Sequence, residues 1–165
     1  MRGSERGFTL VEMLVVVLII GILLGITLLS PMTGVHKIVQ EQAGRLEVLF
    51  AQVRDRALLE NVEYGFSVQK DGSYKWWVMP VESRQWVLLE ESPLQPYQMP
   101  KKLNLWLESE ELVTRLDDSE EEGPEVVFYS DRQATPFKLY ISAAEDPKQS
   151  VVLLTDGLSD VEVTR

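Results

Sequence analysis

Few residues in this 165-residue chain are of the types that carry out chemistry. The chain has no cysteine, which excludes disulfides, thiol nucleophiles and cysteine-ligated zinc, and its one histidine is His36. The sequence contains no nucleotide-binding loop, nucleophile elbow or metal-ligand spacing, and the adjacent acids Glu90 and Glu91 would point to opposite faces of a strand. We therefore predict that the protein is not an enzyme and uses no cofactor or metal.

Glu12 stands out because it lies within an apolar run. Residues 10–29 are all aliphatic, Met or Gly apart from Glu12 and Thr27. A helix of this length spans roughly 30 Å, the hydrocarbon thickness of a bilayer, so we predict a transmembrane helix. An acid at the centre of such a helix costs about 2.5–3.5 kcal/mol. Two interpretations are open: Glu12 reaches the headgroups from near the helix end, or it pairs with a cation inside a protein assembly.

The lengths of chain on the two sides of the predicted span indicate its orientation. Arg2 and Arg6 precede the span and Lys37 and Arg45 follow it, so the positive-inside rule gives no preference. A few residues lie before the span and a much longer acidic part follows, which fits a translocated domain tethered by one helix. A cleaved secretory signal is the competing interpretation, but its apolar region is usually about 7–15 residues long.

The segment RGFTLVE at residues 6–12, followed at once by the apolar run, resembles the prepilin signature of type IV pilins and type II secretion pseudopilins. The resemblance implies that residues 1–7 are a leader, that prepilin peptidase cuts between Gly7 and Phe8, and that Phe8 is then N-methylated. Cleavage would free an α-amine with a pKa of about 7.7–8.0, four residues before Glu12 on the same helix face. In the family, this glutamate is thought to meet the N-terminal amine of a neighbouring subunit.

Gly21 and Gly25 form a GxxxG pair within the predicted span of residues 8–30. Such a pair lets two helices approach closely in a membrane. Glycines are common in membrane helices, so an incidental pair is an equal alternative. Both interpretations fit a filament whose apolar helices bundle at its core. Pro31 removes a backbone donor and should kink or loosen the helix at the membrane exit.

An amphipathic helical stalk is predicted for residues 31–61. Its apolar residues recur at alternating steps of four and three, which is the spacing of one buried helix face. They are Val39, Ala43, Leu46, Phe50, Val53 and Ala57, with Arg45, Glu47, Arg54, Asp55 and Arg56 between them. Because barely three heptads are present, packing against the protein's own sheet is favoured over a coiled coil.

Residues 62–165 have the alternation and turn residues of an antiparallel β domain. The predicted strands are residues 64–68, 73–79, 85–90, 103–108, 126–130, 137–142, 150–155 and 158–163. Asp156-Gly157 predicts a hairpin turn between the last two strands, and three prolines predict an irregular loop at residues 92–102. About eight strands indicate a sandwich or a strongly curved sheet. The fold class is therefore α+β and pilin-like, with a long N-terminal helix packed on an antiparallel β-sandwich.

Aromatic and acidic residues are the candidates for contacts with partners. The four tryptophans are Trp76, Trp77, Trp86 and Trp106. We expect the tryptophans to lie in the sheet core rather than to form a ligand platform. Trp76 and Trp77 are adjacent and must point to opposite faces of the strand, so one of the two contacts the helix or a partner. Residues 108–125 hold nine acids and one base, which predicts a solvated loop, with an acidic docking surface as the alternative.

Residues after the predicted membrane span indicate which type of pilin-like protein the chain resembles. The order of Arg45-Leu46, Tyr64-Gly65-Phe66, Trp86, Leu103-Asn104-Leu105 and Thr135-Pro136-Phe137 resembles minor pseudopilins of the H type, the GspH family. This resemblance implies a helix topped by two β-sheets in a type II secretion pseudopilus tip. It also implies a bacterial inner-membrane protein with one span and a periplasmic C-terminal domain. The implied partners are the I, J and K types, the major pseudopilin and prepilin peptidase.

Charge distinguishes this interpretation from its alternative, a minor type IV pilin of the FimU/FimT kind that acts in pilus assembly or DNA uptake. The chain has 16 Lys and Arg against 26 Asp and Glu, for a net charge of −10. Because affinity for the phosphate backbone rests on clustered Lys and Arg, no nucleic-acid partner is expected. The acidic balance therefore favours the pseudopilin.

Overall fold

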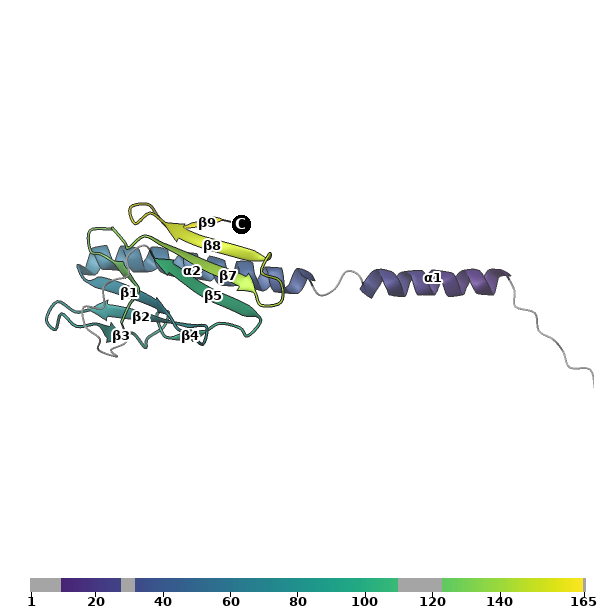
Figure 1. The fold of residues 1–165 in the computed structure, drawn as a ribbon, viewed down its shortest axis with the longest axis horizontal. Coiled ribbons are helices and arrows are strands. Elements are labelled where there is room, and N and C mark those ends of the chain that lie inside the picture. The colour runs from purple at the N-terminus through teal and green to yellow at the C-terminus, as the bar shows by residue number, and fades with distance from the viewer. Residues whose placement is uncertain (1–9, 28–31, 110–122, 165) are drawn as a thin grey trace, which may run out of the picture. The chain divides into compact units, whose positions relative to one another are not determined.

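The computed structural model describes residues 10–27, 32–109 and 123–164 of the chain (Figure 1). The chain divides into two compact units, Met1–Val35 and His36–Arg165. Helix α1 extends over Leu10–Thr27 in the first unit, and helix α2 extends over Met32–Glu60. The continuity of one long N-terminal helix, which the sequence predicts, depends on residues 28–31, and these lie outside the described residues.

Nine described strands follow α2 and form two antiparallel sheets (Figure 1). The strands are β1 (Glu63–Val68), β2 (Ser73–Met79), β3 (Val87–Leu88), β4 (Tyr97–Gln98), β5 (Leu103–Ser109), β6 (Val126–Phe128), β7 (Phe137–Ala143), β8 (Ser150–Thr155) and β9 (Glu162–Thr164). The first sheet has the order β3-β2-β1-β6, with β4 also paired to β2, and the second has the order β5-β7-β8-β9. The predicted α+β architecture, a helix on antiparallel sheets, is confirmed.

Helix α2 buries its predicted apolar stripe against both sheets. All six residues of the stripe are at most 1% exposed. Phe50 lies at the centre of the core, with its ring 5.1 Å from Phe66 and 5.5 Å from Trp76 in the first sheet, and 5.1 Å from Phe137 in the second. The stripe therefore packs on the chain's own sheets, as predicted. The helix ends where Asn61 adopts the left-handed conformation, with a φ of 52°.

Three predicted strands are shorter in the structure, and one strand was missed. The segment 126–130 contains only β6, which ends at Phe128. The segment 85–90 contains only β3, so Glu90 and Glu91 lie outside any strand and their predicted placement is wrong. The segment 158–163 begins with a loop, because the Asp156 carboxylate accepts hydrogen bonds from the amides of Leu158 and Ser159 at 3.0 and 2.7 Å. The predicted hairpin turn is therefore too short. The missed strand, β4, lies in the proline-rich loop and pairs with β2.

The tryptophans differ in burial, although all four were predicted in the core. Trp76 faces α2, as expected for one member of the adjacent pair, and is fully buried. Trp77 is also buried, and its indole N–H donates to Ser67 Oγ at 2.9 Å. Trp86 is half-buried. Trp106 is 63% exposed and stacks on the Tyr140 ring at 5.2 Å, so its predicted burial is wrong.

Candidate assembly sites

Helix α1 presents apolar side chains on all its sides. Every large apolar side chain described between Leu10 and Ile22 is at least 43% exposed. A continuous apolar surface of this kind normally marks a site of contact with a membrane or with other proteins. Within the described ranges of the chain, no helix has both the length and the apolar character needed to cross a membrane.

Glu12 lies in the first turn of α1 and is exposed. The positive end of the helix dipole is at this terminus, so the position favours a carboxylate. The two other residues of the predicted processing site, Gly7 and Phe8, lie outside the described residues. The structure therefore places Glu12 at the start of α1 and leaves its relation to the N-terminal amine as a prediction.

Gly21 has open surroundings. A Cβ added at Gly21 would meet no described atom within 4 Å. Packing within the described chain therefore does not require glycine at this position, whereas close approach of a second helix would. Gly25 lies four residues further along the same helix, which puts both glycines on one face. The structure describes open space only at Gly21 and does not test the predicted contact.

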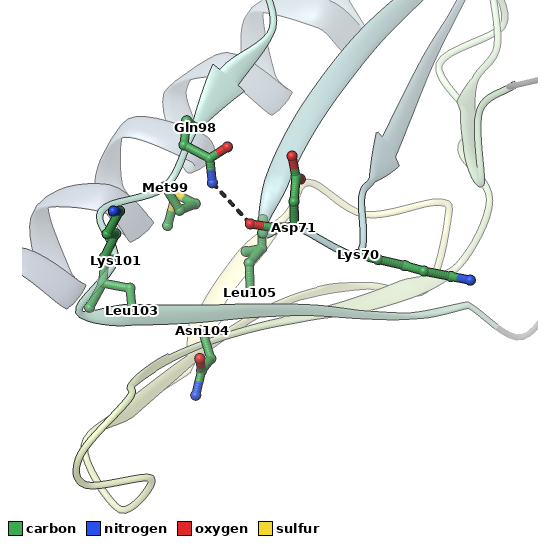
Figure 2. A pocket seen from close by; sticks show the side chains of 9 residues that line it. Lys70, Asp71, Gln98, Met99, Lys101, Leu103, Asn104 and Leu105 are labelled. Carbon is green, nitrogen blue, oxygen red and sulfur yellow. Dashed lines mark hydrogen bonds between the residues drawn. The ribbon is translucent and has the colours of Figure 1, made fainter.

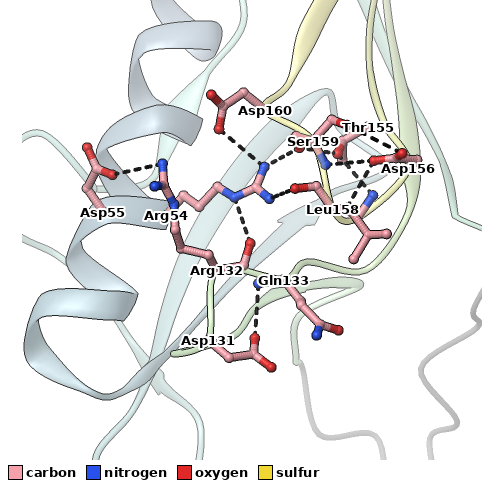
Figure 3. Close-up of polar contacts among 11 residues, drawn as sticks. Arg54, Asp55, Asp131, Arg132, Gln133, Thr155, Asp156, Leu158, Ser159 and Asp160 are labelled. Carbon is pink, nitrogen blue, oxygen red and sulfur yellow. Dashed lines mark hydrogen bonds and ion pairs between the residues drawn. The ribbon is translucent and has the colours of Figure 1, made fainter.

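In the second unit, Arg54 of α2 binds two loops of the β domain, one that contains Arg132 and one between β8 and β9 (Figure 3). Its side chain is 5% exposed, and its Nε–H donates to the carbonyl of Arg132 at 2.8 Å. Its two terminal nitrogens donate to the carbonyls of Leu158 and Ser159. One of them also forms an ion pair at 3.5 Å with Asp160, whose side chain is 79% exposed. Two of these part-buried hydrogen bonds attach the β8–β9 loop to α2, and the third attaches the loop that contains Arg132.

Arg54 lies between the apolar positions of the stripe in the sequence, and its side chain is itself buried. It follows Phe50 by four residues and precedes Ala57 by three, so helical spacing places it on the buried face. The spacing was therefore sufficient to find it. The carbonyls that it binds come from segments about 80 and 105 residues away along the chain, and no local pattern predicts them.

Tyr64 and Tyr74 are the buried ionisable groups with the largest shifts among the described residues. Burial raises the pKa of each to about 12, and a hydrogen bond from the Tyr64 hydroxyl to Glu60 adds to the effect there. The Tyr74 hydroxyl has no hydrogen-bond partner among the described residues. Both phenols stay protonated at neutral pH, so neither is suited to act as a general base.

The remaining candidates for chemistry do not converge on one site in the part of the chain that the structure describes. His36 is exposed, and its Nε2 lies 2.8 Å from Gln40 Nε2. No group of three or more His, Cys, Asp or Glu side chains within the described ranges is placed to hold a metal ion. These residues therefore offer no site from which a reaction or a metal centre can be argued.

The predicted acidic loop is described only at its two ends. Residues 110–122, which carry most of its acids, lie outside the described residues. At one end, Glu108 accepts a hydrogen bond from the Tyr140 hydroxyl at 3.0 Å. At the other end, Glu125 accepts one from the Val68 amide at 3.1 Å. Both terminal acids are thus bound to neighbouring strands, and the predicted solvated loop is not tested.

Comparison with known proteins finds a match to a known sequence motif at the N-terminus, which includes the start of α1. Residues 2–28 match the prokaryotic N-terminal methylation motif. The chain is also 29% identical, over 176 residues, to type II secretion system protein H of Pseudomonas aeruginosa, with 100% of this chain and 99% of that protein covered. Together the two matches support an H-type minor pseudopilin. The motif lies at the N-terminus of the chain, and the similarity to protein H extends along its whole length.

Solved pseudopilins have the same fold. The minor pseudopilin EpsH from the type 2 secretion system of Vibrio cholerae superposes with a TM-score of 0.63 at 13% identity, covering 76% of this chain and 95% of EpsH. The solution structure of Escherichia coli GspH gives a TM-score of 0.60 at 22% identity, covering 79% and 89%. The predicted resemblance to the H type is thus confirmed by motif, sequence and fold.

Proposed function

We propose that this pseudopilin is a structural subunit of the type II secretion pseudopilus, placed in the minor-pseudopilin complex at its tip. The similarity to type II secretion system protein H, which extends over the whole chain, carries this proposal. The subunit acts by packing rather than by catalysis: the apolar surface of α1 joins the helical core of the filament, and the β domain contacts partners. Those partners are the I, J and K types and the major pseudopilin.

Processing of the N-terminus is the step that prepares α1 for assembly. In this proposal, prepilin peptidase cuts between Gly7 and Phe8, and Phe8 becomes N-methylated. The new amine then pairs with Glu12 of a neighbouring subunit, which removes the cost of an isolated charge in an apolar surrounding. The methylation motif at residues 2–28 and the exposed position of Glu12 in the first turn of α1 support this role.

The proposal also gives each segment a location in the bacterial cell. Residues 1–7 are the leader, and residues 8–30 cross the inner membrane once. Residues 31–61 form the helical stalk, and residues 62–165 form a periplasmic β domain with the acidic loop at 108–125. The apolar side chains exposed along α1 and the separate hydrophobic core of the second unit support this arrangement.

The first test is mass spectrometry of the N-terminus after expression in a host with active prepilin peptidase. The protein extracted from membranes should give an N-terminal peptide that begins with methylated Phe8, and a Gly7→Ala control should reduce cleavage. An intact Met1 terminus, or a terminus at Ser30, would contradict the processing step.

A further inference from the structure

A polar pocket of about 580 Å³ opens between the turn that joins β1 to β2 and the start of β5 (Figure 2). Residues 70–72, 98–99, 101 and 103–105 line it. Gln98 closes one wall, because its side-chain amide donates to the Asp71 carbonyl at 3.0 Å. We call these residues the lysine pocket, since Lys70 and Lys101 extend from opposite sides of it in the view (Figure 2).

The charge of the lysine pocket is opposite to that of the chain. Lys70 and Lys101 are exposed, and neither has a hydrogen-bond or ion-pair partner among the described residues. Lys102 is the next residue along the chain and is also exposed. The acid that lines the pocket, Asp71, already accepts hydrogen bonds from the amide and hydroxyl of Ser73 at 2.9 and 2.7 Å, which lower its pKa. Asp71 therefore stays ionised and offsets one lysine, so the lining keeps a small excess of positive charge, two lysines against one aspartate, in a protein with a net charge of −10.

A free strand edge borders the lysine pocket. Among the described strands, β5 pairs only with β7. The Ala144 amide donates to the Lys102 carbonyl, so residues 102 and 144 form a hydrogen-bonded pair. In an antiparallel ladder such pairs occur at every second residue. Residues 104, 106 and 108 therefore direct their backbone groups toward β7. The amides and carbonyls of Leu105 and Leu107 consequently face the opposite edge. That edge lies on the pocket side, because the lining includes the start of β5 and no residue of β7.

We propose that an extended acidic segment of a partner protein adds as a strand to the free edge of β5 and places its carboxylates in the lysine pocket. The backbone of the segment pairs with Leu105 and Leu107, which supplies affinity that is independent of side chains. Its carboxylates contact Lys70 and Lys101, which selects acidic segments. A side chain on its outer face lies beside the exposed Trp106, an aromatic residue of the kind enriched at binding hot spots.

The observations favour a peptide over other anionic or small ligands. A small-molecule pocket is usually lined mainly by apolar and aromatic side chains, whereas about half of this lining is polar and lysines lie on its two sides. Nucleic acids bind through rows of Lys and Arg that neutralise successive phosphates, and this acidic domain provides only a short cluster. A strand edge with unpaired backbone groups is a feature that only a peptide can match.

The test uses the full-length chain in detergent micelles and a fluorescent eight-residue peptide of alternating glutamate and valine. Fluorescence anisotropy at low salt should show binding that weakens about tenfold in the double variant Lys70→Glu/Lys101→Glu. Lys148→Glu, at an exposed lysine in the β7–β8 loop, is the matched control and should bind as the unmodified chain does. Methylation of the peptide's backbone amides should also weaken binding, and amide exchange should slow at Leu105 and Leu107.

The proposal is overturned by any of four results. These are absence of peptide binding, equal binding by the double variant, slowed exchange confined to other strands, and tighter binding of a single-stranded oligonucleotide of equal charge. The inference rests on the proposed role in assembly, but peptide binding needs no N-terminal processing. A negative peptide result together with a methylated Phe8 would therefore reject the strand-addition site and leave the pseudopilin function in place.

Discussion

At the scale of the residue, Arg54 shows how one buried charge holds two distant loops on a helix. A buried guanidinium is costly to desolvate and is tolerated where several acceptors surround it. The carbonyls of Arg132, Leu158 and Ser159 provide these acceptors (Figure 3). The exposed partner Asp160 adds little, because exposed ion pairs contribute about 0–1 kcal/mol. The hydrogen bonds to carbonyls therefore account for most of the attachment.

Replacement of Arg54 by methionine, which preserves most of the chain length of the side chain, should destabilise the second unit. Arg54→Met leaves three carbonyls without their donor, so we expect the free energy of unfolding to fall by about 2–4 kcal/mol. Urea unfolding followed by circular dichroism measures this change. Asp160→Asn is the matched control and should change the value by less than about 0.5 kcal/mol. Equal effects of the two substitutions would show that the ion pair, not the carbonyl contacts, is the important interaction.

Tyr74 gives a prediction for alkaline pH. Its pKa is raised to about 12 by burial, while an unfolded tyrosine has a pKa of about 10. Between these values the folded state binds more protons than the unfolded state, so stability falls as pH rises from about 10 to 12. Tyr74→Phe should make the unfolding free energy less dependent on pH in this window. At pH 7 it should cost little, because the hydroxyl has no described hydrogen-bond partner. An unchanged alkaline slope would assign the effect to Tyr64 or to other groups.

At the scale of the element, Gly65 in a strand and Gly44 in a helix have different surroundings. Replacing each by alanine separates the effect of packing from the effect of backbone freedom on stability. Gly65 lies in β1, where an added Cβ would fall 2.4 Å from Pro124 Cβ and 3.2 Å from Trp77 Cβ. Gly44 lies in α2, where an added Cβ would meet no described atom within 4 Å. The strand therefore requires glycine for close approach of the chain before β6, whereas the helix does not require it.

Substitution by alanine should consequently have opposite signs in the two elements. Gly65→Ala is expected to lower the free energy of unfolding by about 1–3 kcal/mol through overpacking. Gly44→Ala is expected to raise it by about 0.5–1 kcal/mol, because alanine is the better residue in a helix. Thermal unfolding of both variants tests this pair. A stabilised Gly65→Ala variant would mean that the segment around Pro124 moves easily away from β1.

The helix and strands that could be predicted from the sequence are those whose limits are set by the spacing of their own apolar residues and by the turn residues beside them. The stripe of α2 follows helical spacing, and β2 and β8 are short runs of β-branched, aromatic or other apolar residues bounded by turn residues, so their limits were found closely. β9 was overextended because Asp156 and Arg54 hold the loop before it, and the second of these contacts comes from another element. Alternation also placed Trp106 on one face of β5, but whether that face is covered depends on tertiary packing.

At the scale of the whole molecule, the average composition conceals segments of different character. A net charge of −10 and an even balance of polar and apolar residues describe an ordinary acidic protein. The structure instead has one unit with an exposed apolar helix and another with its own core and a basic pocket. Such a division suits a subunit whose contacts are made by distinct surfaces, and the proposed role of this protein in assembly rests on that division.

Capture of partners by the unit His36–Arg165, which contains the complete described β domain and its core, distinguishes a role in secretion from a role in pilus assembly or DNA uptake. The immobilised unit is mixed with purified soluble domains of the other minor pseudopilins and, separately, with labelled DNA and type IV pilus tip proteins. We expect capture of the I-type or J-type pseudopilin and no retention of DNA. Capture of DNA or of type IV tip proteins, with no pseudopilin retained, would contradict the role in secretion.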